Sequence, residues 1–191
     1  MNRSIVYYNP NSANKTQLKT LKRIEDDLQK EMYRQIGIVS GSFGIALYEN
    51  WGWREKRIGK FFQEIVNAWE ECAKDPDISM LEMCENETGI VIGIPGCENS
   101  YKDLIFFTSD TRHVEMTIEK RICMRLSQKK WLGPEMIAAA LVSLHRIYNF
   151  GYDRLSKVYQ QMEEVRDRYN WDADTIEKEC YAMTNVAIDV K

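Results

Sequence analysis

The chain has 191 residues, of which 44% are hydrophobic and 29% are charged. This composition excludes a disordered or fibrous protein and supplies enough apolar residues for one good core or two small ones. No apolar run approaches the length of a membrane span, and the N-terminus lacks a charged-then-apolar signal pattern, so we expect a cytoplasmic protein. The five cysteines include no Cys-x-x-Cys pair, which argues against a disulfide framework and a zinc site.

The first helix is predicted to follow an N-terminal extension at residues 1–14. Asn14, followed three residues later by Gln17, fits the capping box that opens a helix. The helix then carries a narrow apolar stripe on a charged surface, made of Leu18, Leu21, Ile24, Leu28 and Met32. The stripe has two interpretations. Either the helix packs on its own domain, or Leu21, Leu28 and Met32 form the seam of a homodimer.

Three glycines interrupt the apolar stretch 36–48, namely Gly37, Gly41 and Gly44. Each lowers helix propensity by about 1 kcal/mol relative to Ala. We therefore expect either a loop followed by a short helix or a helix whose backbone closely contacts a neighbour.

A stretch of the chain occurs twice, about one hundred residues apart. Both copies contain an aromatic-Gly-aromatic turn, Arg, Lys, Gln, an Asp-x-Asp segment, and a Cys four residues before a Thr. The first copy runs through Trp51-Gly52-Trp53, Arg57, Lys60, Gln63, 75–77, Cys84 and Thr88. The second runs through Phe150-Gly151-Tyr152, Arg154, Lys157, Gln160, 172–174, Cys180 and Thr184. We interpret this pattern as an internal duplication in which Gly52 and Gly151 occupy equivalent interhelical turns.

Each copy predicts a helical unit, one within residues 15–90 and the other within 131–191. Apolar residues at helical spacing follow both turns. Asp75 with Pro76 predicts the start of a further helix in the first copy, and Gly133-Pro134 opens the second unit.

The connector at residues 91–130 has a different pattern. The β-prone runs 90–92 and 104–107 flank turn-forming residues, and alternate positions from 114 to 126 are mostly apolar. A spacing of four would also place 114, 118, 122 and 126 on one helix face. We favour strands, and the predicted fold class is α+β, mainly α, with two helical units joined by a small antiparallel β connector.

Charge is distributed unevenly along the chain. Residues 64–87 contain eight acidic residues and one lysine, and residues 163–179 contain seven acidic and three basic residues. The connector stretch 112–130 has six basic and two acidic residues. This segregation points to charged partners rather than to a fold.

Candidate catalytic groups are few. His113 and Glu115 have the spacing of a zinc deaminase but lack the downstream Pro-Cys-x-x-Cys. Glu119 and Lys120 are adjacent, so on a strand they would point to opposite faces rather than build a nuclease site. With two histidines and no phosphate-binding loop, we expect neither an enzyme nor a cofactor or metal.

Two surfaces are candidates for binding nucleic acid or a partner. The first combines turn aromatics with cations and comprises Trp51, Trp53, Arg54, Lys56 and Arg57. The alternative is that both tryptophans simply fill the corner between helices. The second is the basic side of the connector, with Arg121, Arg125, Lys129 and Lys130, which is either a solvated face or a phosphate-binding surface.

The second copy also resembles a known helical motif. The stretch 148–155, Tyr-Asn-Phe-Gly-Tyr-Asp-Arg-Leu, followed by a helix and Asp-x-Asp-Thr, is similar to a motif in accessory proteins of Firmicutes phages and mobile elements. The resemblance covers each copy but not the connector, and the first copy departs from it by extra residues after Trp53. It implies a helical fold, and it implies inhibition of host defence as a role, because such accessory proteins include anti-CRISPR proteins.

These observations lead to two functional hypotheses. In the first, a non-catalytic phage or mobile-element accessory protein binds and inhibits a nucleic-acid-handling host protein, such as a CRISPR effector nuclease, through its acidic helical face. The residues of that face are Glu64, Glu70, Glu71, Glu163, Glu164 and Asp167. The alternative is a DNA-binding regulator that uses the basic connector.

Overall fold

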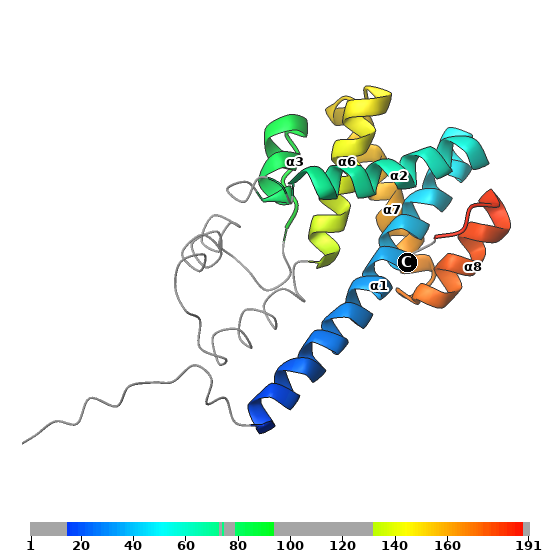
Figure 1. Ribbon diagram of the computed structural model, residues 1–191. Coiled ribbons are helices and arrows are strands. Elements are labelled where there is room, and N and C mark those ends of the chain that lie inside the picture. The colour runs from blue at the N-terminus through cyan, green and yellow to red at the C-terminus, as the bar shows by residue number, and fades with distance from the viewer. Residues whose placement is uncertain (1–14, 73, 75–78, 94–131, 189–191) are drawn as a thin grey trace, which may run out of the picture.

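The computed structural model describes residues 15–72, 74, 79–93 and 132–188. Every regular element in this part of the chain is an α-helix. The helices are α1 (Lys15–Trp51), α2 (Glu55–Cys72), α3 (Met80–Thr88), α6 (Leu132–Tyr148), α7 (Tyr152–Arg168) and α8 (Ala173–Thr184). The N-terminal half of α1 extends beyond the other described helices (Figure 1).

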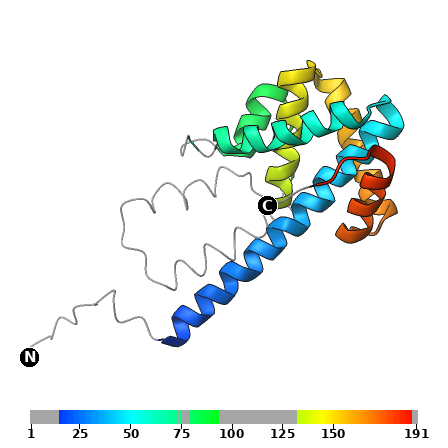
Figure 2. The ribbon, with the colours of Figure 1, turned by 45° about the vertical axis from the view of Figure 1, so that its right-hand side comes forward.

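The two halves of the chain are intertwined. The first helix of each half packs mainly against the second and third helices of the other half, so α1 contacts α7 and α8, and α6 contacts α2 and α3. The helices α1 and α6 also contact each other. Figure 2 shows α8, from the second half, beside the C-terminal half of α1, from the first half. The core therefore forms between the halves rather than within each one.

The glycine-rich stretch belongs to the continuous helix α1, so the second of the two sequence interpretations is right. A Cβ atom built on Gly41 would lie 2.5 Å from Ile176 Cγ2, and one on Gly44 would lie 2.8 Å from Cys180 Sγ. Both neighbours are on α8. The missing side chains thus let α8 approach the backbone of α1, and this packing compensates for the low helix propensity of glycine.

The two interhelical turns are closed by equivalent backbone hydrogen bonds. The Trp53 amide donates to Leu47 O at 3.1 Å, and the Phe150 amide donates to Leu144 O at 3.3 Å. In the alignment of the two turns that this hydrogen bond defines, Trp53 is equivalent to Phe150. Gly52 is then equivalent to Asn149, and these two residues have φ angles of 64° and 50°.

The prediction that Gly52 and Gly151 lie in equivalent interhelical turns is confirmed, but the two glycines do not occupy the same position within those turns. Gly151 precedes α7 as its N-cap with a φ of −78°, which is not left-handed. Asparagine tolerates the left-handed conformation better than most residues, so the second copy needs no glycine at the position of Gly52.

The third helix of each half ends in the same way. Thr88 Oγ1 donates to Cys84 O at 2.7 Å and accepts from the Ile90 amide at 3.1 Å. Thr184 Oγ1 donates to Cys180 O and accepts from the Val186 amide at the same two distances. Each helix then ends at a left-handed residue, Gly89 or Asn185. The matched Cys and Thr of the sequence repeat are thus a shared C-terminal cap.

The helix α3 begins later than the sequence predicted. Its N-cap is Ser79, whose hydroxyl accepts from the Glu82 amide, and Met80 is its first residue. The predicted start at Asp75 and Pro76 is wrong for this helix, and both residues lie outside the described part of the chain. The corresponding cap of α8 is Asp172, whose carboxylate accepts from the Thr175 amide at 3.1 Å.

Equivalent positions of the two copies fill the centre of the core. The following side chains have no exposed surface: Leu47, Ile58, Phe61, Leu144, Leu155 and Val158. Each contributes about 1.5–3 kcal/mol of hydrophobic stabilisation. Ile58 with Phe61 and Leu155 with Val158 face inward because residues three apart share one side of a helix.

The predicted α+β fold class is wrong, because the described residues form an all-α structure. The β-prone run at residues 90–92 has no regular secondary structure and no strand partner among these residues. Ile90 and Ile92 are buried in the core, whereas Val91 is 66% exposed. Packing on helices accounts for this alternation as well as a sheet would. The predicted runs 104–107 and 114–126 lie outside the described residues.

Candidate functional site

An aromatic cluster joins the two interhelical turns. The ring centroids of Trp51 and Phe150 are 4.9 Å apart, and those of Trp53 and Tyr148 are 4.5 Å apart. Trp53 also meets Phe150 edge to face at 6.0 Å. The turns are far apart in sequence, and this stacking holds them side by side. We call these four rings the corner cluster.

The tryptophans of the predicted binding surface belong to this cluster. Trp53 is only 2% exposed, and Trp51 is half-buried with its indole N–H donating to Gln161 Oε1 at 2.8 Å. Their position agrees with the alternative sequence interpretation, in which they fill the corner between helices. The cations Arg54, Lys56 and Arg57 of the same predicted surface are exposed.

Guanidinium groups cover the rings from outside. The Arg57 guanidinium lies 4.3 Å from the centroid of the Trp53 ring and 5.0 Å from that of Tyr148. Its equivalent, Arg154, lies 4.9 Å from the centroid of the Phe150 ring. Each arginine follows the ring it covers by four residues, the spacing of one helical turn. Arg54 stacks in turn on Tyr48 at 4.5 Å.

Two residues of the predicted acidic face are occupied by ion pairs. Arg146 binds Glu71 at 2.5 Å and Glu87 at 2.6 Å, and so connects α6 to α2 and α3. The hydrogen bond with Glu87 is the main cause that raises the pKa of Arg146. On α7, Arg166 pairs with Glu163, and its guanidinium lies 3.5 Å from the Trp171 ring. These carboxylates support the fold.

The other four residues of the predicted face carry charge that no cation pairs among the described residues. Glu64, Glu164 and Asp167 accept hydrogen bonds only from the neutral side chains of Asn67, Gln160 and Trp171. Glu70 is exposed. Glu64 and Glu70 lie on α2, whereas Glu164 and Asp167 lie on α7, so the set is divided between two helices.

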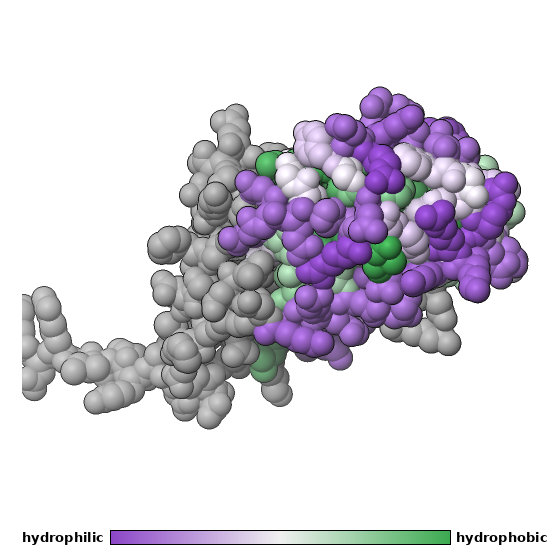
Figure 3. Space-filling view, turned by 90° about the horizontal axis from the view of Figure 1, so that it is seen from above, coloured by the Kyte–Doolittle hydropathy of each residue, from purple (hydrophilic) through white to green (hydrophobic). Residues whose placement is uncertain are grey.

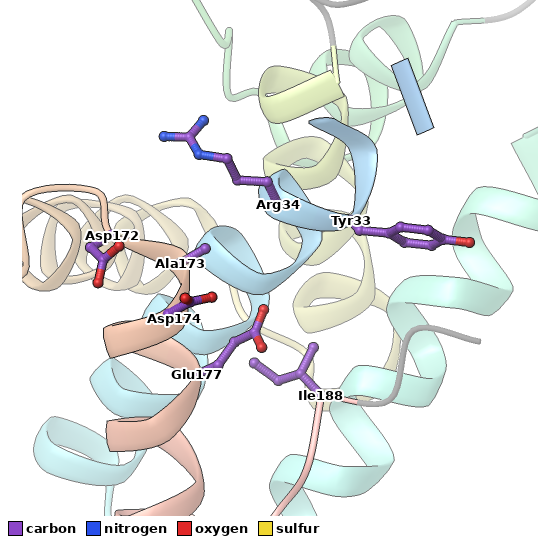
Figure 4. A pocket seen from close by; sticks show the side chains of 7 residues that line it. All are labelled: Tyr33, Arg34, Asp172, Ala173, Asp174, Glu177 and Ile188. Carbon is purple, nitrogen blue, oxygen red and sulfur yellow. The ribbon is translucent and has the colours of Figure 1, made fainter. Parts of the chain in front are cut away.

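Further carboxylates, which sequence reasoning did not select, surround a hollow of about 560 Å³ between α1 and α8 (Figure 4). Its walls are Tyr33, Arg34, Asp172, Ala173, Asp174, Glu177 and Ile188. Figure 4 shows Glu177 and Ile188 extending toward each other while Arg34 points away from them. The ion pair of Arg34 is with Glu31 at 3.0 Å, so Arg34 forms no ion pair with these carboxylates, although its charge contributes to lowering the pKa of Asp172.

The charge states of the hollow follow from its geometry. Hydrogen bonds from the side chain and backbone of Thr175 hold the pKa of Asp172 below its usual value. Burial and the nearby Asp174 raise the pKa of Glu177. A cation entering the hollow would reduce the repulsion between the carboxylates of Asp174 and Glu177. The acidic run 163–179 was visible in the sequence, but the approach of α8 to α1 was not.

Among the described residues, few reactive side chains have the environment of a catalytic or metal-binding group. Burial raises the pKa of the Cys84 and Cys180 thiols to about 11, so both remain protonated at neutral pH. His145, in the last turn of α6, has its Nδ1 3.0 Å from Phe150 O, and this contact orients the imidazole ring toward the second interhelical turn. Burial also raises the pKa of Glu135, in the first turn of α6, to about 7. Within the described ranges no group of three or more His, Cys, Asp and Glu side chains could hold a metal ion.

Some predicted residues are not placed or not tested. The connector residues Arg121, Arg125, Lys129 and Lys130 lie outside the described residues. Leu21, Leu28 and Met32 are half-buried on the N-terminal half of α1, and their role in a homodimer stays a prediction. No helix among the described residues is both long and apolar enough to cross a membrane.

The described residues form an all-α structure of two intertwined three-helix halves joined at an aromatic corner. In comparisons with known proteins, no family model, curated protein or solved structure matches the chain.

Proposed function

We propose that this protein is a non-catalytic accessory protein that acts in the cytoplasm by binding and inhibiting a nucleic-acid-handling protein of the host. The resemblance of its turn motif to phage and mobile-element proteins indicates a CRISPR effector nuclease as the target class. The observation that carries the proposal is the acidic end of the second half. It comprises Glu164, Asp167, Asp172, Asp174 and Glu177, and none of these forms an ion pair with a described residue.

The carboxylates of this acidic end are connected through the structure. Asp167 Oδ1 accepts from the Trp171 indole at 2.9 Å, and Trp171 O accepts from Arg34, which lines the hollow, at 3.5 Å. The charges are therefore held on packed helices rather than on a flexible tail. Preorganised charges lose less conformational entropy on binding. A rigid acidic surface is complementary to the basic channel with which a nuclease binds its nucleic acid.

The proposal can be tested by reversing exposed charges at this end. In the variant Glu164→Lys/Asp167→Lys/Asp174→Lys, capture of a nucleic-acid-handling protein from a lysate of the native host should be lost. Surface substitutions usually change stability by within about 0.5 kcal/mol each, so the fold should persist, as thermal unfolding would show. The matched control is Glu25→Lys/Asp26→Lys/Asp27→Lys, on the exposed N-terminal half of α1.

Inhibition is the second readout. The captured protein should lose affinity for its nucleic acid when the wild-type chain or the control variant is added, and should keep it with the reversed variant. Equal capture by both variants, or capture without loss of nucleic-acid binding, would refute the proposal. The alternative, a DNA-binding regulator that uses the connector, predicts instead that only Arg121→Gln/Arg125→Gln/Lys129→Gln/Lys130→Gln abolishes function.

A further inference from the structure

Cations gather at the N-terminal ends of α2 and α7, where helix energetics disfavours them. Lys56 and Arg57 lie in the first turn of α2, and Arg154 lies in the first turn of α7. The N-terminus of a helix carries a partial positive charge, so a cation there is unfavourable, whereas carboxylates stabilise it. Glu55 and Asp153 are the only acidic residues in these two turns. Helix stability therefore does not explain the positive charge.

The cluster extends one turn further along both helices. Lys60 and Lys157 are exposed and occupy equivalent positions in the two copies. With Arg54, six exposed cations lie in the first interhelical turn and in the first two turns of α2 and α7, and none forms an ion pair within the described part of the chain. Seen from above in Figure 3, most of the described surface at this end of the molecule is hydrophilic.

The rings hold the arginines in place. The guanidinium faces of Arg54, Arg57 and Arg154 stack on aromatic rings. Such contacts are worth about 0.5–1 kcal/mol each at exposed sites. Stacking uses the face of the guanidinium and leaves N–H groups at its edge. In two of the three arginines one of these groups donates to a turn carbonyl, Trp53 O for Arg54 and Asn149 O for Arg154. The remaining N–H groups can form the paired hydrogen bonds that phosphate accepts.

We infer that the cations around the corner cluster bind the phosphate backbone of single-stranded nucleic acid. The six residues are Arg54, Lys56, Arg57, Lys60, Arg154 and Lys157. Tyr152, two residues before Arg154 at the start of α7, is 59% exposed, and its ring lies beside Gly89 at the end of α3. Stacking of a base on an exposed aromatic ring is worth about 1–3 kcal/mol and requires no particular sequence.

The exposed ring distinguishes nucleic acid from an acidic protein segment. Both ligands would satisfy the guanidinium groups, but only a nucleic acid brings an aromatic base beside each phosphate. The helices α2 and α7 both begin directly after the two joined turns, and the dipole at a helix N-terminus favours phosphate. This inference goes beyond the proposed function, which depends on the acidic end of the second half, and either can fail alone.

The test measures binding of the full-length protein to a fluorescent single-stranded DNA of about 20 nucleotides, in salt from about 50 to 200 mM. In Arg54→Gln/Arg57→Gln/Arg154→Gln, affinity at the lowest salt should fall by about tenfold or more. The salt slope should decrease by about 2–3, which corresponds to the loss of three phosphate contacts. The control Lys22→Gln/Arg23→Gln/Lys30→Gln changes net charge equally on the exposed part of α1 and should stay within about twofold of wild type.

A second variant avoids the stacked arginines. Lys60→Gln/Lys157→Gln removes two cations that stack on no ring among the described residues, so it should weaken DNA binding without lowering thermal stability. Equal losses in the charge-matched control would reduce the effect to net charge and overturn the inference. Tighter binding of a polyglutamate peptide than of DNA would assign the surface to an acidic protein. Loss of DNA binding only in the connector variant Arg121→Gln/Arg125→Gln/Lys129→Gln/Lys130→Gln, or no binding at the lowest salt, would also overturn it.

Discussion

Thr88 and Thr184 show how single hydroxyl groups terminate helices in this protein. Each accepts the backbone amide two residues later while donating to the carbonyl four residues earlier. Each hydroxyl therefore provides an acceptor for an amide just beyond the helix end, where the chain turns away. The surroundings differ, because the hydrogen bond to the Ile90 amide is buried and the one to the Val186 amide is partly buried.

This difference predicts unequal costs for the same substitution. Thr88→Val keeps the shape of the side chain but leaves the buried Ile90 amide without its acceptor, which should destabilise the protein by about 1–3 kcal/mol. Thr184→Val should cost less, because water can reach the Val186 amide. Urea unfolding would measure both values. Thr88→Ser retains the hydroxyl and serves as control, so a serine variant as unstable as the valine variant would contradict the explanation.

At the scale of the helix, the close contact between α1 and α8 limits the size of the side chains on the face of α1 that packs against α8. Gly41 and Gly44 face buried atoms of Ile176 and Cys180, neither of which has exposed surface. A Cβ on Gly37 would instead overlap the carboxylate end of Glu177, which can swing into the adjoining hollow. The three glycines therefore have different reasons for being in one helix.

We expect Gly44→Ala and Gly41→Ala to destabilise the protein, since overpacking a rigid contact costs about 1–3 kcal/mol. Gly37→Ala should be neutral or stabilising by up to about 1 kcal/mol, because the gain in helix propensity is not offset by a rigid clash. Thermal unfolding of the three variants would decide between these outcomes. If Gly37→Ala is as harmful as Gly44→Ala, the contact with Glu177 is not as adaptable as its geometry indicates.

At the scale of the whole molecule, the intertwined halves share one core. Because α1 contacts α7 and α8 while α6 contacts α2 and α3, each half buries its apolar faces mainly against the other. Each half is expected to need the other to fold. The ion pairs of Arg168 with Glu49 and of Arg146 with Glu71 also cross between the halves.

The halves should therefore stay together after the chain is cut between them. A protease site inserted after Gly93, which is exposed and has no atoms within 4 Å of where a Cβ would lie, can be cleaved in the folded protein. The two fragments should coelute in gel filtration and show a melting temperature that rises with concentration, since unfolding now separates two chains. Fragments that separate under native conditions would exclude a shared core.

The sequence by itself determined the local structure of this protein. The helical spacing of apolar residues, the two turns and the matched Cys and Thr follow from interactions between residues a few positions apart. It also indicated the segregation of charge and the cations Arg54, Lys56 and Arg57. Local chemistry could not tell whether 90–92 would pair as a strand, because alternating burial serves a sheet and a helical core equally well.

Only the tertiary structure decided which half each helix packs against and what each charged side chain meets. The pattern of the repeat is the same whether its copies pack separately or intertwine, because apolar faces do not specify their partners. Glu71 was indistinguishable in sequence from Glu70, yet Arg146, on a helix of the other half, forms an ion pair only with Glu71 of these two. The joining of Arg57 and Arg154 at one corner likewise depends on contacts between the two turns. Long-range packing sets these relations, and no short-range pattern encodes them.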